Sequence, residues 1–245
     1  MKTLKQHIFE KLKVSKNPYT LFPETKDELK RMVADEILKY GNKCSLNHIN
    51  VSKITDMSSL FFNSSFNGDI SNWNVSNVTT MHGMFAFSKF NGDISNWNVS
   101  KVENMKYMFE KSRFNGDISN WDVSNVKDMS YMFLDSKYNG DISNWDVSNV
   151  KYMGNMCYGS IFNGDISNWD VSNCEFMEFM FKNSVFNQDI SKWNVSKVKN
   201  FRDMFQSSKF NQNIDNWTPK KSSNFKDMFY KSPLQNNPPK WFYTL

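Results

Sequence analysis

Few residues in this 245-residue sequence have the types and spacing that catalysis or metal binding requires. The histidines lie far apart, and none stands at the short spacing from another ligand that zinc sites show: His7, His48 and His82. Each serine belongs to a recurring column without a local base, and the glycines recur in turns and not in a phosphate-binding loop. The sequence therefore predicts no catalytic residues, no metal site and no cofactor.

The cysteines give a similar picture. Their number is odd, so they cannot all pair with one another, and they have no close spacing: Cys44, Cys157 and Cys174. Cys157 and Cys174 coincide with apolar positions of the repeat described below. We expect free, buried thiols in a reducing compartment, with a disulfide or a metal site as the alternative.

One column of carboxylates recurs every 24 residues, four positions before a tryptophan: Asp69, Asp93, Asp117, Asp141, Asp165 and Asp189. If successive copies stack at roughly 4.8 Å, the spacing of paired strands, these charges repel unless each is hydrogen-bonded or a cation lies between them. Aspartate after Asn-Gly commonly accepts a hydrogen bond from its own turn. We therefore expect a structural role, with calcium binding as the alternative.

Asparagine and aspartate also flank the tryptophans on both sides, at positions expected to point away from the core. They are the candidate residues for binding a protein or glycan partner: Asn96, Asn98, Asn120, Asp122, Asn144, Asp146, Asn168 and Asp170. The alternative is that the asparagines hydrogen-bond to each other along a stack and serve only the fold. More varied residues, including Lys106, Tyr131 and Arg202, occupy a second expected surface.

Composition excludes several classes of protein. Thirty Lys and Arg against 25 Asp and Glu give a net charge of +5, too small to indicate specific nucleic-acid binding. A hydrophobic content of 39% and a mean hydropathy of −0.63 leave no candidate membrane span, and 16% aromatic residues argue against disorder. Charges are scattered through the first residues, which lack the apolar run of a secretory signal. We expect a cytoplasmic or virion-associated protein.

The dominant feature of the sequence is an internal repeat. All eight tryptophans are spaced by 24 residues, from Trp73 to Trp241, which is typical of a repeat protein. One unit, residues 114–137, reads FNGDISNWDVSNVKDMSYMFLDSK. One unit alone buries too little apolar surface to offset its loss of conformational entropy, so the units must stack on one another.

The apolar spacing within the unit predicts a short strand followed by a short helix. Trp121 and Val123 are two residues apart, which places both side chains on one face of a strand. A spacing of three or four, the period of a helix, then links Val126, Met129, Met132 and Phe133. Asn-Gly near the start of most units indicates a turn.

The unit resembles a known family. FNGDIxNWDVSNVxxMxxMFxxS is similar to the repeats of BspA-like leucine-rich-repeat surface proteins, in the subclass labelled a mycoplasma domain of unknown function, over about residues 46–216. The resemblance implies a right-handed α/β solenoid and a role in surface or protein interactions, and it brings no catalytic residues. The expected fold class is therefore α/β, a right-handed leucine-rich-repeat-like solenoid of about eight 24-residue strand–helix coils with a helical N-terminal cap.

The two ends differ from the repeats. Thr25 and Glu28 form a capping box that predicts a helix closed by Gly41. Residues 1–16 predict a separate basic amphipathic helix, which either packs on the cap or docks to a protein groove or an anionic surface. Its docking residues would be Lys5, Phe9, Leu12 and Lys13. Prolines near the C-terminus predict that pairing between coils ends there, with Trp241 folded back over the last coil.

The expected organisation has four segments. They are the N-terminal helix at 1–16, a linker and cap helix at 17–43, the repeat solenoid at 44–232 and a C-terminal cap at 233–245. Two classes of function fit them. The first is a non-enzymatic repeat scaffold that mediates protein or glycan interactions. The second is a structural or packaged component of a larger assembly, such as a phage or virus particle, docked through residues 1–16.

Overall fold

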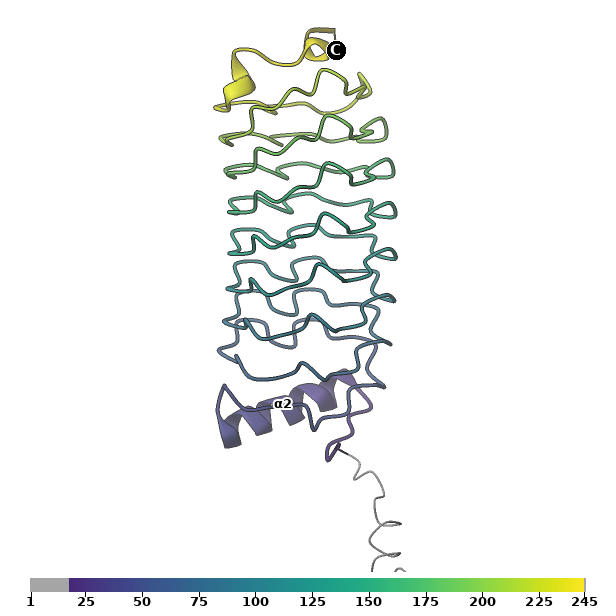
Figure 1. Ribbon diagram of the computed structural model, residues 1–245, viewed down its shortest axis with the longest axis vertical. Coiled ribbons are helices and arrows are strands. Elements are labelled where there is room, and N and C mark those ends of the chain that lie inside the picture. The colour runs from purple at the N-terminus through teal and green to yellow at the C-terminus, as the bar shows by residue number, and fades with distance from the viewer. Residues whose placement is uncertain (1–17, 245) are drawn as a thin grey trace, which may run out of the picture.

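The computed structural model describes residues 18–244, which form a stack of coils (Figure 1). Helices occur only at the two ends of this described part: α2, Lys26–Tyr40, beneath the first coil, and the 3-10 helices η1, Pro233–Gln235, and η2, Lys240–Thr244, at the last coil. None of these helices is long and apolar enough to cross a membrane. From Ser45 onward, isolated parallel bridges link residues 24 apart, as between Asn104 and Asp128, so the sequence period is also the structural period.

The expected α/β class, with its leucine-rich-repeat-like strand–helix coils, is wrong. The coils within the described residues contain no continuous strand and no helix. The segment expected to be a strand, residues 118–126, contains two tight turns instead. The N–H of Trp121 donates to the carbonyl of Ile118 at 3.2 Å, and the N–H of Val126 donates to the carbonyl of Val123 at 2.9 Å.

The segment expected to be a helix is the ladder that joins one coil to the next. Alternate N–H groups donate to carbonyls of the following coil at 2.8–2.9 Å: Met129 to Tyr152, Tyr131 to Gly154 and Phe133 to Met156. The N–H groups between them turn back within the coil, as from Met132 to the carbonyl of Met129 at 3.2 Å. An α-helix needs each N–H to bond four residues back, so the ladder and a helix exclude each other.

Two left-handed residues in each coil explain why the sequence resembled a helix. In one coil φ is 63° at Tyr131 and 48° at Asp135, and glycine takes this role only at Gly83 and Gly159 among the described coils. The left-handed Tyr131 turns the chain between Met129 and Met132, so that both methionines face the core. The result is an apolar spacing of three that imitates a helical period.

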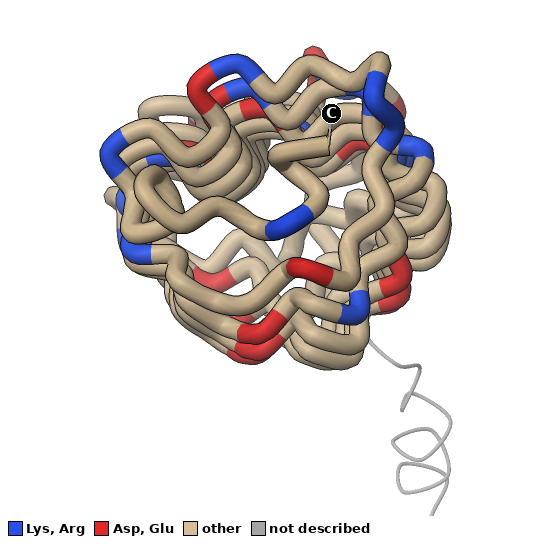
Figure 2. Tube along the Cα trace, turned by 90° about the horizontal axis from the view of Figure 1, so that it is seen from above, with Lys and Arg blue, Asp and Glu red and all other residues tan. Residues whose placement is uncertain are grey.

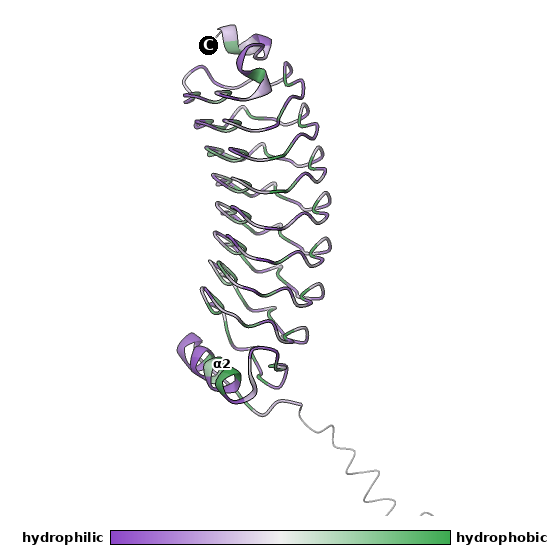
Figure 3. Ribbon diagram, turned by 90° about the vertical axis from the view of Figure 1, so that its left-hand side faces the viewer, coloured by the Kyte–Doolittle hydropathy of each residue, from purple (hydrophilic) through white to green (hydrophobic). Residues whose placement is uncertain are grey.

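The core consists of columns of like side chains. The tryptophans from Trp73 to Trp217 have an exposed fraction of no more than 4%. Neighbouring rings stack almost in parallel, with centroids 6.4 Å apart for Trp73 and Trp97 and 5.7 Å apart for Phe85 and Phe109. Figure 3 shows hydrophobic and hydrophilic residues alternating along each coil. Every coil therefore places the same apolar set inside the stack.

Each tryptophan also fixes the register between coils through its indole. The Nε1–H of Trp145 donates to the carbonyl of Ile118 at 3.0 Å, and all eight tryptophans make the same bond to the carbonyl 27 residues earlier. An indole N–H or a carbonyl that is buried without a partner costs free energy. The bond thus allows a large ring to be buried at every coil.

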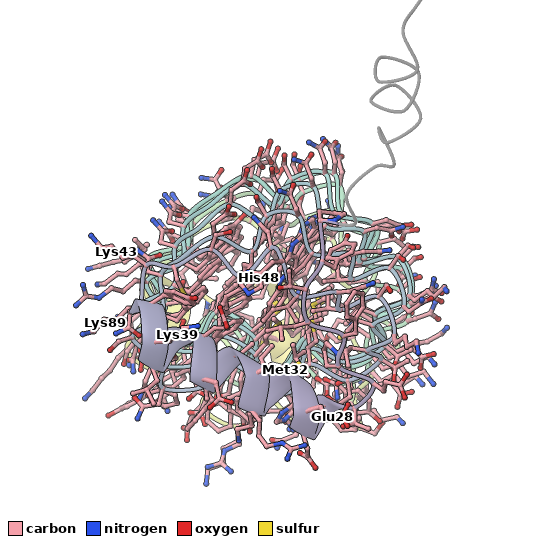
Figure 4. The ribbon with its side chains drawn as sticks, turned by 90° about the horizontal axis from the view of Figure 1, so that it is seen from below. Glu28, Met32, Lys39, Lys43, His48 and Lys89 are labelled. Carbon is pink, nitrogen blue, oxygen red and sulfur yellow. The ribbon has the colours of Figure 1, made fainter. Side chains whose placement is uncertain are left out.

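The helix expected from the capping box is present as α2. The side chain of Thr25 accepts from the N–H of Glu28 at 3.2 Å, and the N–H of Gly41 donates to Ile37 at the other end. Leu29 and Val33 are buried against the first coil. Figure 4 shows α2 crossing the base of the stack. The helix thus covers the apolar end that the first coil would otherwise expose.

The C-terminal residues cover the other end. Trp241 folds back as expected, with its ring 6.4 Å from that of Trp217 and its indole bonded to Ile214 at 2.7 Å. Unlike the other tryptophans it is only partly buried.

Truncation of a tryptophan should cost most in the middle of the stack. Trp145→Ala should lower the free energy of unfolding by about 3–5 kcal/mol, because it leaves a cavity and removes one of the two hydrogen bonds that the Ile118 carbonyl accepts. Trp241→Ala should cost much less, since that ring is half-buried at an end. Urea denaturation of both variants measures this difference, and equal losses would contradict it.

The cysteines differ in burial, and this predicts an order of reactivity. Cys157 and Cys174 are 2% and 0% exposed, whereas Cys44 is half-buried, and all three thiols are free. Burial raises the pKa of each thiol, that of Cys174 to about 12. Iodoacetamide should therefore modify Cys44 first in the folded protein, and the other two only after unfolding. Mass spectrometry over time gives the order, and early modification of Cys157 would refute it.

Candidate functional site

Polar side chains cover the outside of the coils, and most of them support the fold. In the carboxylate column, Asp93 Oδ1 accepts from the backbone N–H of Ser95 at 2.9 Å and from its hydroxyl at 2.7 Å. The other column members hold their own turns in the same way. The structural role expected for this column is confirmed. Seen along the stack, charged residues lie on the outer rim of the coils (Figure 2).

These turns set the electrostatics of the column. The N–H and hydroxyl of Ser95 hold the pKa of the Asp93 carboxyl below its usual value, while Asp69 and Asp117 on the neighbouring coils act in the opposite direction. The N–H bonds therefore outweigh the repulsion between stacked charges. In residues 18–244, no three His, Cys, Asp or Glu side chains gather closely enough to hold a metal ion.

Half of the predicted partner-binding residues also hold turns. In the row that follows the tryptophans, Oδ1 of each side chain accepts from the backbone N–H two residues later, at 3.0–3.1 Å. The members of this row are Asn98, Asp122, Asp146 and Asp170. These side chains are exposed to solvent, but each already accepts a hydrogen bond that stabilises its own turn.

The other half of the predicted residues does not stabilise a turn. The row preceding the tryptophans, which we call the asparagine row, comprises Asn96, Asn120, Asn144 and Asn168. All four are exposed, and none of their side chains forms a hydrogen bond with any residue that the structure describes. The alternative that these asparagines bond to each other along the stack is therefore wrong.

Two further asparagine columns show what a structural asparagine does in this fold. The N–H of Asn115 donates to Oδ1 of Asn91 at 2.7 Å, one coil earlier. In the second column, Nδ2 of Asn125 donates to the carbonyl of Ser100 at 2.7 Å. The asparagine row thus differs from both columns in leaving its carboxamides free.

The structure adds a surface cluster that the sequence did not identify as one unit. His82, Tyr107 and Tyr131 come from three successive coils, and the tyrosine rings stack with centroids 4.5 Å apart. The Lys106 ammonium lies over both tyrosines, at 5.2 and 5.7 Å. For the two tyrosines the signal was present as aromatic residues 24 apart at a variable position, whereas His82 stands 25 residues before Tyr107. The docking residues Lys5, Phe9, Leu12 and Lys13 lie outside the described residues.

Comparison with known proteins gives one family. The family model described as "Mycoplasma protein of unknown function, DUF285" matches residues 27–139, 110–184 and 135–241 in overlapping stretches. The match supports a mycoplasma-type repeat, but not the leucine-rich-repeat or BspA-like part of the resemblance. No curated protein and no solved structure matches the chain.

The carboxylate column predicts loss of stability in acid. Each member has a folded-state pKa below its ordinary value. The charged form therefore stabilises the fold above the unfolded-chain pKa of about 4, and this stabilisation is lost as the pH falls through the folded-state pKa. The triple variant Asp93→Asn, Asp117→Asn, Asp141→Asn should lack this contribution already near pH 7, because the neutral carboxamide oxygen accepts the same bonds more weakly than the carboxylate does.

Urea denaturation near pH 7 and near pH 3 tests this expectation. The triple variant should lose less free energy of unfolding in acid than the parent chain does. An acid loss as large as that of the parent would show that these carboxylates do not cause it.

Proposed function

We propose that this chain, which belongs to the family described as Mycoplasma protein of unknown function, DUF285, is a non-enzymatic repeat scaffold that binds a protein or glycan partner along its asparagine row. One observation carries the proposal. Asn96, Asn120, Asn144 and Asn168 are exposed and unbonded within the described chain, whereas the neighbouring polar rows all serve the fold.

The chemistry of the row suits an extended polar ligand. A carboxamide offers two donors and one acceptor group, so it can bond to sugar hydroxyls or to peptide amides. Neighbouring members lie one coil apart, roughly 4.8 Å, and one long ligand can contact several of them. Asp122 Oδ2 and Asp146 Oδ2 bond to nothing in the described chain, which adds acceptors beside the row. Many weak contacts along a rigid row add to a useful affinity.

The non-enzymatic part of the proposal rests on how the reactive groups are used. The serine hydroxyls next to the row hold turns, as Ser95 does on Asp93. His48 Nε2 pairs with Glu36 Oε2 at 3.0 Å, and His82 contacts the Tyr107 ring. Within residues 18–244, neither imidazole bonds to a serine or a cysteine that it could activate.

Removal of three members of the row should weaken binding without loss of stability. The triple variant Asn120→Ala, Asn144→Ala, Asn168→Ala should lose at least about tenfold in affinity for its ligand, because each carboxamide contributes a hydrogen bond. Its melting temperature should be unchanged, since these side chains make no bond within the fold. Arrays of immobilised glycans and peptides identify the ligand with the parent chain, and titration then measures both affinities.

A matched pair of variants separates binding from folding. Asn125→Ala with Asn149→Ala removes two bonds to Ser100 and Ser124, so it should lower the melting temperature and spare binding at a temperature where the protein is folded. If the row variant binds every ligand of the parent chain equally well, the asparagine row is not the binding site.

A further inference from the structure

The last coil presents a row of backbone donors that no part of the described chain accepts. One coil earlier, alternate N–H groups bond upward at 2.8–2.9 Å: Phe201 to Asn224, Asp203 to Lys226 and Phe205 to Met228. The equivalent groups of the last coil are the N–H groups of Phe225, Asp227 and Phe229, which we call the donor edge. They form no hydrogen bond with residues 18–244.

The C-terminal residues cap only part of this edge. The N–H of Lys231, the fourth in the series, donates to Gln235 Oε1 at 2.5 Å. Phe242 then packs edge-on against the rings of Phe229 and Phe225, with centroids 5.3 and 6.4 Å away. The tail therefore covers the apolar rings and leaves the donor edge without acceptors. Unpaired edge groups of this kind are ready to pair with another chain.

A second copy of the chain is not suited to fill the edge. The matching acceptors on the first coil would be the carbonyls of Asp56, Ser58 and Leu60. Helix α2 lies against this part of the first coil: the Lys26 side chain pairs with that of Asp56 at 3.1 Å, and Ile37 lines a groove with Leu60. Because the helix occupies the place of a preceding coil, head-to-tail stacking of two copies is blocked.

The charge around the donor edge indicates an acidic partner. The lysines nearest in sequence form no ion pair within the described chain: Lys220, Lys221, Lys226 and Lys231. Asp215 and Asp227 are the acidic residues at this end of the described chain. Asp215 is paired with Lys240 at 3.2 Å, so Asp227 alone supplies a negative charge that is not neutralised by an ion pair. The alternate ladder peptides that bond between coils also direct their N–H toward this end, which adds partial positive charge. The basic residues 1–16 of another copy are disfavoured for the same reason.

We propose that the donor edge binds an extended acidic segment of a partner protein, which adds one more rung to the ladder. Carbonyls of alternate residues in the segment accept from Phe225, Asp227 and Phe229, and its acidic side chains contact the lysines. Addition of a strand to an open edge is a common mode of peptide recognition. This site is separate from the asparagine row and stands independently of the function proposed for it.

A labelled peptide of about ten alternating Glu and Val residues is a suitable probe. Fluorescence anisotropy with the full chain should show saturable binding, and a Lys and Val peptide of the same length should not bind. Amide hydrogen exchange by NMR should be fast at Phe225, Asp227 and Phe229 in the free protein. The acidic peptide should slow exchange at these three amides.

Variants that reverse the charge of the lysines near the donor edge test their part in peptide binding. Lys226→Glu with Lys231→Glu should weaken binding of the acidic peptide by at least about tenfold. The control, Lys89→Glu with Lys137→Glu, changes the same charge at exposed positions on coils far from the edge, and it should bind like the parent.

Three results would overturn the proposal. The first is unchanged exchange at the three amides under saturating peptide. The second is equal weakening by the control pair. The third is exchange at these amides that slows with protein concentration in the absence of peptide, which would make a second copy the occupant.

Discussion

The structure depends on one constraint, the registration of each residue with its counterpart 24 residues away. Ladder peptides, tryptophan indoles and the column containing Asn91 and Asn115 all form bonds that require this offset. The bonds are modest one by one, since a typical net contribution is about 1 kcal/mol. They are repeated at every coil, and a single inserted residue would shift all of those that span the insertion at once. The same offset stacks the rings, so hydrogen bonding and apolar burial specify one register together.

This constraint also explains why the candidate site can be recognised. Most polar positions of the unit are committed to turns or to neighbouring coils, as Asp93 and Asn125 are. A position that repeats without such a commitment therefore stands out, and the asparagine row is one. At the C-terminal end, the donor edge is exceptional for the opposite reason. Its backbone N–H groups have no acceptor in the described chain, whereas the equivalent N–H groups of all the preceding coils are hydrogen-bonded. Both inferences come from comparing a residue with its own repeats.

The sequence predicted the period, the core positions, the cap helix and the return of Trp241 over the last coil. Trp145, Met129 and Phe133 are buried as their recurrence indicated, and Thr25 begins a helix as its capping box did. It did not predict the local structure of the coil. Left-handed backbone at Tyr131 and Asp135 is not encoded by glycine, so nothing in the residue types marks it.

For the candidate site, the sequence located the residues but did not show which of their side chains are hydrogen-bonded within the fold. Asn96 and Asn98 are the same residue type two positions apart, yet only Asn98 bonds to a backbone N–H. That difference depends on the turn at Ser100. Whether a side chain can accept a hydrogen bond from such a turn is decided by the backbone geometry, which the residue type does not specify. The free N–H of Phe225 could not be foreseen either, since the sequence pattern suggested a helix in that part of each unit.

The independence of the coils has a consequence for the history of such proteins. A coil touches only the coil before it and the coil after it, and all inner coils present nearly the same surfaces to each other. Recombination between repeats within a gene that adds or removes one whole unit would leave every remaining contact intact. Chain length can then change in steps of one coil while both terminal covers are retained. Relatives built on this plan would differ in height by whole coils.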